Sequence, residues 1–100
     1  MSLESRITKH CKKRMKERNI SLQMVEAVAY CGERFVDSDN SGYPGIRYSL
    51  NENSYKKYPF LDENWKGLSL FSNANGTIKT VYKDEKKYFK TYWQRVVKKV

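Results

Sequence analysis

The stretch WKGLSLFSNANGTIKTVYKD, residues 65–84, decides the fold of this 100-residue chain. Two runs rich in β-forming residues flank Asn75 and Gly76, a pair favoured in tight hairpin turns because both residues tolerate a positive φ. Strands joined by so short a turn must be antiparallel neighbours in one sheet. The stretch therefore predicts a β-hairpin that turns at Asn75-Gly76.

Upstream of this hairpin, two shorter stretches show the period-two pattern of strands. Residues 34–38, RFVDS, form a strand candidate, and residues 46–50, IRYSL, alternate apolar side chains with Arg47 and Ser49 as a half-buried strand should. SGYPG, residues 41–45, has the composition of a turn between them. Residues 51–64 are polar with scattered aromatic anchors, which indicates a long loop.

The first third of the chain has the period of helices. Residues 4–18 carry an apolar stripe at four-residue spacing, and Asn19 ends this helix. Ser21 is a good N-cap for a second helix over 22–31, which Gly32 would end in a left-handed conformation. With only about three residues between them, the two helices should pack as a hairpin. The stripes are Ile7, Cys11 and Met15 in the first helix, and Leu22, Val25, Val28 and Ala29 in the second.

A last helix is expected at the C-terminal end, in DEKKYFKTYWQRVVKK, residues 84–99. The predicted order is therefore α-α-β-β-β-β-α. This is a single α+β domain over residues 1–100, in which the helical hairpin and the last helix pack on a sheet of three or four antiparallel strands.

The basic residues gather at the two ends of the chain. The net charge is +9, and residues 1–20 and 83–100 each hold seven lysines or arginines against two acids. If the ends pack side by side, they form one positive surface, which favours a polyanion such as nucleic acid. Simple solubility is the plainer interpretation of the same charge.

Several functional classes lack support. No apolar run reaches the roughly 20 residues that span a bilayer, so we expect a soluble cytoplasmic protein without membrane contact. Cys11 and Cys31 are expected in the core, and one histidine without a Cys-x-x-Cys pair makes a metal site improbable. No glycine-rich phosphate loop or paired carboxylates occur, and we expect no cofactor.

One row of the first helix combines residues suited to phosphate chemistry. His10, Arg14 and Arg18 recur every four residues and therefore lie in one row beside the apolar stripe. Arginine binds phosphate oxygens through two hydrogen bonds, and histidine titrates near neutral pH and can act as general acid or base. The alternative is structural: His10 caps a carbonyl, and the arginines pair with glutamates. Lys12, Lys13 and Lys16 are expected to face outward.

A second candidate set lies in the last strand and the last helix. Thr80 and Tyr82 share one face of their strand, and Arg47 projects from the middle of its own strand. Aromatic side chains beside bases suit the stacking of unpaired RNA bases, and Tyr92, Trp93 and Arg95 lie farther along the chain. The alternative is that these aromatic residues belong to the core.

ITKHCKKRMKERNIS, residues 7–21, resembles a small bacterial family with the pattern T-x-H-a-x-x-R-m-x-x-R-g-I-s, which is grouped with RelE/BrnT-like toxins. The resemblance covers residues 7–33 and 77–83, and Asn19 stands where glycine is usual. It implies a small α+β ribonuclease of a toxin–antitoxin system. Residues 38–64 are longer than this resemblance predicts and form a variable insertion. By similarity, the recurring polar positions are His10, Arg14, Arg18 and Thr80.

The first hypothesis is a metal-independent endoribonuclease that cleaves RNA through its own 2′-hydroxyl, with an acidic antitoxin as partner. His10 would be the acid/base, and the row with Thr80 would form the catalytic centre. RNA would be bound by Lys12, Lys13, Lys16, Arg47, Tyr82 and Arg95. The alternative is a non-enzymatic basic binding protein, an inhibitor or modulator of bacterial or phage origin, which docks on nucleic acid or on an acidic protein surface.

Overall fold

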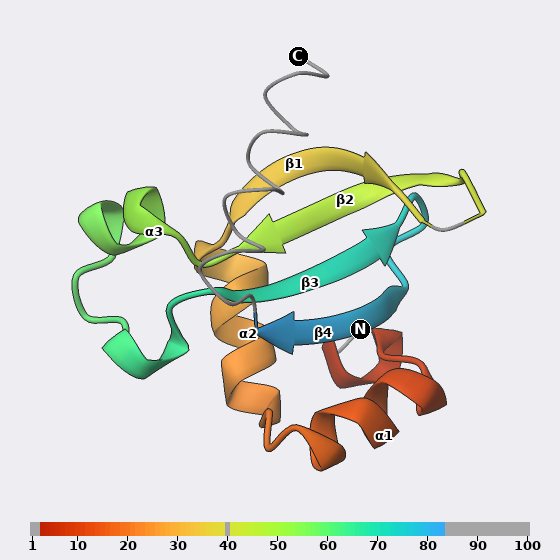
Figure 1. Ribbon diagram of the computed structural model, residues 1–100, viewed down its shortest axis with the longest axis horizontal. Coiled ribbons are helices and arrows are strands. Elements are labelled where there is room, and N and C mark those ends of the chain that lie inside the picture. Colours follow the sequence, from red (N-terminus) through yellow and green to blue (C-terminus); the bar gives the residue numbers. More distant parts are fainter. Residues whose placement is uncertain (1–2, 40, 84–100) are drawn as a thin grey trace.

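Four antiparallel strands in chain order form the sheet: β1 (Glu33–Ser38), β2 (Pro44–Ser49), β3 (Leu68–Asn73) and β4 (Ile78–Lys83). Helices α1 (Lys9–Glu17) and α2 (Leu22–Cys31) precede the sheet, as Figure 1 shows. The computed structural model describes residues 3–39 and 41–83. The predicted α+β class is therefore confirmed, and the predicted helix over 84–99 lies outside the described residues.

The hairpin predicted at Asn75-Gly76 is confirmed. The strands β3 and β4 pair Leu70 with Val81, and Gly76 has a φ of +90° at the turn between them. The turn is held by its own backbone, since the Gly76 amide donates to the Asn73 carbonyl at 3.0 Å. A second contact comes from the chain's beginning, where Arg6 Nε donates to the Gly76 carbonyl at 2.9 Å.

The first helix begins later than residue 4. Leu3–Arg6 form a short 3₁₀ helix, and Ile7 then makes a parallel bridge to Ile78 of β4. Thr8 is the N-cap of α1, because its side chain accepts a hydrogen bond from the Cys11 amide at 3.1 Å. The bridge holds Ile7 to the sheet and therefore interrupts the helix that was predicted from residue 4. The apolar periodicity could not show this contact.

The two helix ends near residues 19 and 32 differ from each other. Asn19 adopts the left-handed conformation with a φ of +56°, which explains how it can stand where glycine is usual. Ser21 caps α2 as predicted, and its hydroxyl accepts from the Met24 amide at 3.2 Å. Gly32 is not left-handed, since its φ of −70° and ψ of 145° are extended. Glycine is required there for space: a Cβ would meet the Val28 carbonyl and, at 3.1 Å, the Ser49 amide.

This close approach makes Gly32→Ala a destabilising change. The added methyl group would meet backbone atoms at the end of α2 and on β2, and neither can move aside cheaply. We expect the free energy of unfolding to fall by about 2 kcal/mol, a typical effect of overpacking. Urea denaturation followed by circular dichroism measures this. An unchanged midpoint would contradict the tight packing of this helix end on the strand.

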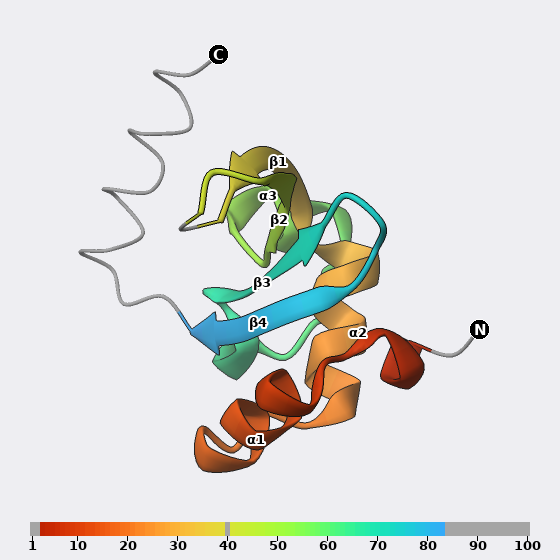
Figure 2. The same ribbon diagram turned by 90° about the vertical axis from the view of Figure 1, so that its right-hand side faces the viewer.

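The core lies between the helices and one face of the sheet. Helix α1 packs on β4, and α2 packs on β3 and β2, so each helix finds its main partner in the sheet instead of in the other helix. Figure 2 shows α1 beneath the β4 edge of the sheet. No helix within residues 3–39 and 41–83 is long and apolar enough to cross a membrane. The buried core consists of Ile7, Cys11, Met15, Ile20, Val25, Val28, Leu50, Leu61, Leu68, Leu70, Ile78 and Val81.

Side chains are also buried on the other face of the sheet. Ser49 was expected on a solvated face, but it is fully buried and accepts a hydrogen bond from the Ser69 hydroxyl at 3.0 Å. Phe35 and Phe71, which lie on that same face, are buried as well. The alternation in residues 46–50 correctly predicted which side chains share a face of the sheet. It did not predict that the face with Ser49 also buries side chains.

Residues 51–64 are not the plain loop that their polarity suggested. They contain α3 (Glu52–Lys57), and a 3₁₀ turn follows at Glu63–Trp65. Asn51 caps α3 by accepting from the Ser54 amide at 3.1 Å. The aromatic anchors Tyr55 and Tyr58 pack against the core and hold the segment in place.

Candidate nucleic-acid interface

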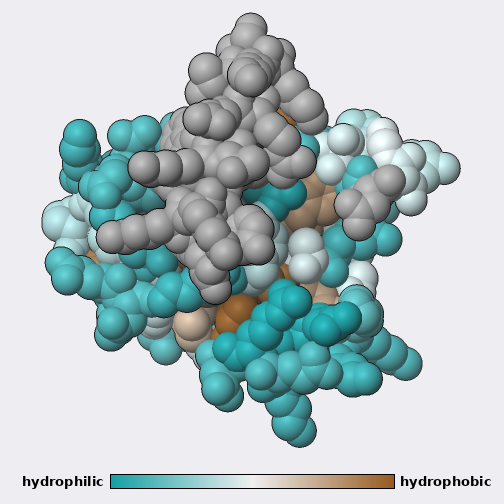
Figure 3. All heavy atoms as spheres, viewed as in Figure 1, coloured by the Kyte–Doolittle hydropathy of each residue, from teal (hydrophilic) through white to brown (hydrophobic). Residues whose placement is uncertain are grey.

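Helix α1 presents a cationic surface. Because Cys11 and Met15 turn toward the core, the other positions of this short helix are exposed. In Figure 3 the region of α1 is strongly hydrophilic. Five bases and one histidine therefore lie on about two and a half turns of exposed helix, which creates a local positive potential suited to a polyanion. These exposed residues are Lys9, His10, Lys12, Lys13, Arg14 and Lys16.

Arg18 does not project freely from this surface. Its Nη1 donates a hydrogen bond to the Val81 carbonyl at 2.9 Å, which fastens the end of α1 to the edge strand β4. Burial raises the pKa of the nearby Cys11 thiol, and the positive charge of Arg18 partly opposes that rise. Arg18 thus shields an edge of the sheet that would otherwise expose backbone acceptors.

His10 and Arg14 lie in more open surroundings. Arg14 forms an ion pair with Glu17, one of the structural partners considered above, with 3.5 Å between Nη1 and Oε2. Both side chains are nearly half exposed, so the pair contributes about 1 kcal/mol or less. Within the described chain, no carbonyl accepts a hydrogen bond from His10. The capping role considered for this histidine therefore finds no support there.

Thr80, Tyr82 and Arg47 share one face of the sheet. In the strand register Thr80 lies opposite Phe71, and Phe71 lies opposite Arg47. The Arg47 guanidinium lies 5.2 Å from the centroid of the Tyr82 ring and 6.0 Å from that of Phe71. This face is opposite to the one on which α2 packs, as the buried core shows.

Arg47 is mostly buried and forms an ion pair. Its Nε donates to Asp37 Oδ2 at 2.9 Å, and the side chains are only 16% and 13% exposed. Asp37 was missed from the sequence, although its spacing from Phe35 places it on the same face as Arg47. The carboxylate partly neutralises the charge that was assigned to phosphate binding.

The sequence-predicted residues therefore fall into three groups. Thr80, Tyr82 and Arg47 meet on one sheet face, Arg18 binds the β4 edge, and His10 and Arg14 lie on exposed α1. Arg18 connects α1 to the strand that carries Thr80 and Tyr82, because it binds the carbonyl of Val81, which lies between them. Arg95 lies outside the described residues. No group of three or more metal-ligating side chains occurs within 3–39 and 41–83.

The described residues define a small α+β domain with a cationic helix beside the edge of a four-stranded sheet. The chain belongs to the DUF4258 family, described as a domain of unknown function, which it matches over residues 7–92. Comparison with curated proteins and comparison with solved structures gave no significant match.

Proposed function

We propose that the chain is a metal-independent endoribonuclease of the RelE/BrnT-like toxin type, acting in the cytoplasm with an acidic antitoxin as its partner. The observation that carries the proposal is the position of His10 on exposed α1, among five cations and with no carbonyl partner within residues 3–39 and 41–83. A four-stranded meander with helices on one face is compatible with this fold type.

Each residue of the proposed site has a role in the chemistry. His10 takes the proton of the ribose 2′-hydroxyl, and the 2′-oxygen then attacks the adjacent phosphorus. The bond from phosphorus to the 5′-oxygen breaks, and the leaving 5′-oxygen takes a proton from water. Arg14 stabilises the charge that grows on the phosphate. Lys12, Lys13 and Lys16 attract the RNA backbone. Thr80 and Tyr82 would act on the row only indirectly, because they lie on the sheet face opposite the helices and Arg18 joins their strand to α1.

The test is incubation of the purified protein with total bacterial RNA in EDTA. We expect fragments that end in 2′,3′-cyclic phosphate, because attack by the neighbouring hydroxyl retains the phosphate as a ring. Electrophoresis and end-group analysis measure this result. RNA that stays intact at every protein concentration, and with ribosomes added, would overturn the assignment as a ribonuclease.

A second candidate is a non-enzymatic protein that binds nucleic acid through the same helix. Two contacts favour this binding function over catalysis: Arg18 donates to the Val81 carbonyl, and Arg47 pairs with Asp37. Two of the cations assigned to the phosphate are thus already engaged by the protein. Salt-dependent RNA binding without cleavage in the same assay would establish this second function.

A further inference from the structure

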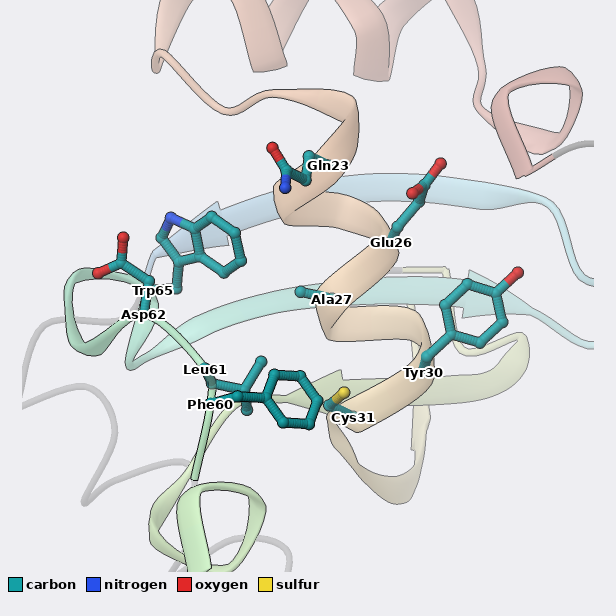
Figure 4. Close-up of a pocket in the computed structure, with 9 residues that line it drawn as sticks. All are labelled: Gln23, Glu26, Ala27, Tyr30, Cys31, Phe60, Leu61, Asp62 and Trp65. Carbon is teal, nitrogen blue, oxygen red and sulfur yellow. The ribbon is translucent and has the colours of Figure 1, made fainter. Parts of the chain in front are cut away.

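A depression of about 590 Å³ lies between α2 and the segment that follows α3. Ala27 and Cys31 of α2 line it on one side, and Leu61 lines it on the other. Figure 4 shows these side chains around one shared hollow, on the outer side of α2. This position is distinct from the cationic surface of α1, so the two can bind different partners.

Three aromatic side chains surround this depression. Tyr30 and Phe60 are 74% and 78% exposed, which is unusual for large apolar residues, and Trp65 is half-buried. In Figure 4, Tyr30 and Trp65 lie at opposite ends of the hollow, with Phe60 between them. Exposed aromatic residues that share one hollow are typical of binding sites, where their removal from water contributes to affinity.

The charge at this depression is opposite to that of the rest of the chain. Among the described residues, its charged lining residues are Glu26 and Asp62, and no described lysine or arginine lines it, although the chain holds 20 bases against 11 acids. Charges of both signs lie near the neighbouring Tyr55, since the Lys66 ammonium lies 5.8 Å from the centroid of its ring. Burial, with the charges of Asp62 and Glu63, raises the pKa of Tyr55 to about 12, and the Tyr55 hydroxyl donates to the Asp62 carbonyl at 2.6 Å.

We infer that this depression binds a basic and apolar segment of a partner protein. An apolar side chain would cover Ala27 and Leu61, and the heads of arginines or lysines would lie beside the carboxylates of Glu26 and Asp62, which stand on opposite sides of the hollow (Figure 4). The aromatic rings suit the stem and the charge of such a side chain, since cations are attracted to ring faces. This inference does not depend on RNA cleavage, because none of these residues lies on α1.

The test is a titration of the ¹⁵N-labelled protein with the peptide acetyl-Leu-Arg-Leu-Arg-amide, followed by heteronuclear NMR. We expect shifts confined to the residues that line the depression, including the Trp65 indole. The matched peptide acetyl-Leu-Glu-Leu-Glu-amide should leave these resonances unchanged. Equal shifts with both peptides, or shifts confined to other surfaces, would overturn the inference.

Two charge reversals separate the site from general electrostatics. Glu26→Lys should lower the affinity for the arginine peptide about tenfold, because it places a lysine beside the bound arginine. Glu17→Lys makes the same change in net charge on α1 and should leave the affinity unchanged. Equal weakening by both variants would contradict a local site. Dimers in sedimentation that Glu26→Lys disrupts would assign the depression to a second copy of the chain and overturn the proposed partner.

Discussion

His10→Ala is expected to lower the rate of RNA cleavage by about 100-fold to 10,000-fold, the range for loss of a general acid or base. The side chain is exposed and donates to no carbonyl of the described chain, so its loss should leave the free energy of unfolding within about 0.5 kcal/mol of the wild type. The measurement is the single-turnover cleavage rate in EDTA, with RNA affinity determined in parallel. Equal rates in the two proteins would remove His10 from the mechanism.

The matched control changes charge on the same helix without removing the histidine. Lys12→Gln combined with Lys13→Gln should weaken RNA binding and reduce the slope of log affinity against log salt by about 1.4, or 0.7 for each phosphate contact on a single strand. The cleavage rate at saturating RNA should stay at the wild-type value. If this variant cleaved saturating RNA more slowly than the wild type but bound RNA with unchanged affinity, α1 would not be the surface that attracts RNA.

Local rules predicted those parts of the fold in which neighbouring residues determine the structure. Asn75-Gly76 marks its hairpin because the turn needs a positive φ, which Gly76 adopts, and Ser21 begins α2 because its hydroxyl accepts from the Met24 amide. Both features were confirmed. They depend on contacts within four residues along the chain, which a sequence displays directly.

The elements that were mispredicted depend on contacts distant in the chain. Ile7 leaves the helical pattern because it bridges to Ile78, and Gly32 is extended because it leads directly into β1, whose first residue pairs with Ser49 of β2. The α3 helix was missed for a different reason. Its six residues have little apolar periodicity, and the capping pair of Asn51 and Ser54 was the available signal.

In the candidate site, too, local features could be predicted from the sequence and contacts distant in the chain could not. Helical spacing correctly placed Cys11 and Met15 inward and the lysines outward. Spacing along one helix could not show which partner each arginine has. Arg14 pairs with Glu17 in its own helix, whereas Arg18 binds a carbonyl of β4.

Asp37→Ala is expected to lower the free energy of unfolding by about 3 kcal/mol, because it removes the carboxylate from a mostly buried arginine. The Nε–Oδ2 distance of 2.9 Å and the exposures of 16% and 13% place this pair away from bulk water. Urea denaturation measures the loss. Glu17→Ala is the matched control, because it breaks a half-exposed pair and should cost about 1 kcal/mol or less.

Arg47→Met decides between the structural and the RNA-binding role of Arg47. If the arginine is retained mainly to pair with Asp37, the double variant Asp37→Ala/Arg47→Met should be more stable than Asp37→Ala alone, because no cation remains buried without that carboxylate. RNA affinity of Arg47→Met should then equal that of the wild type. A fall in affinity with a smaller salt slope would instead show that Arg47 contacts phosphate, since its charge would contribute to the release of counterions.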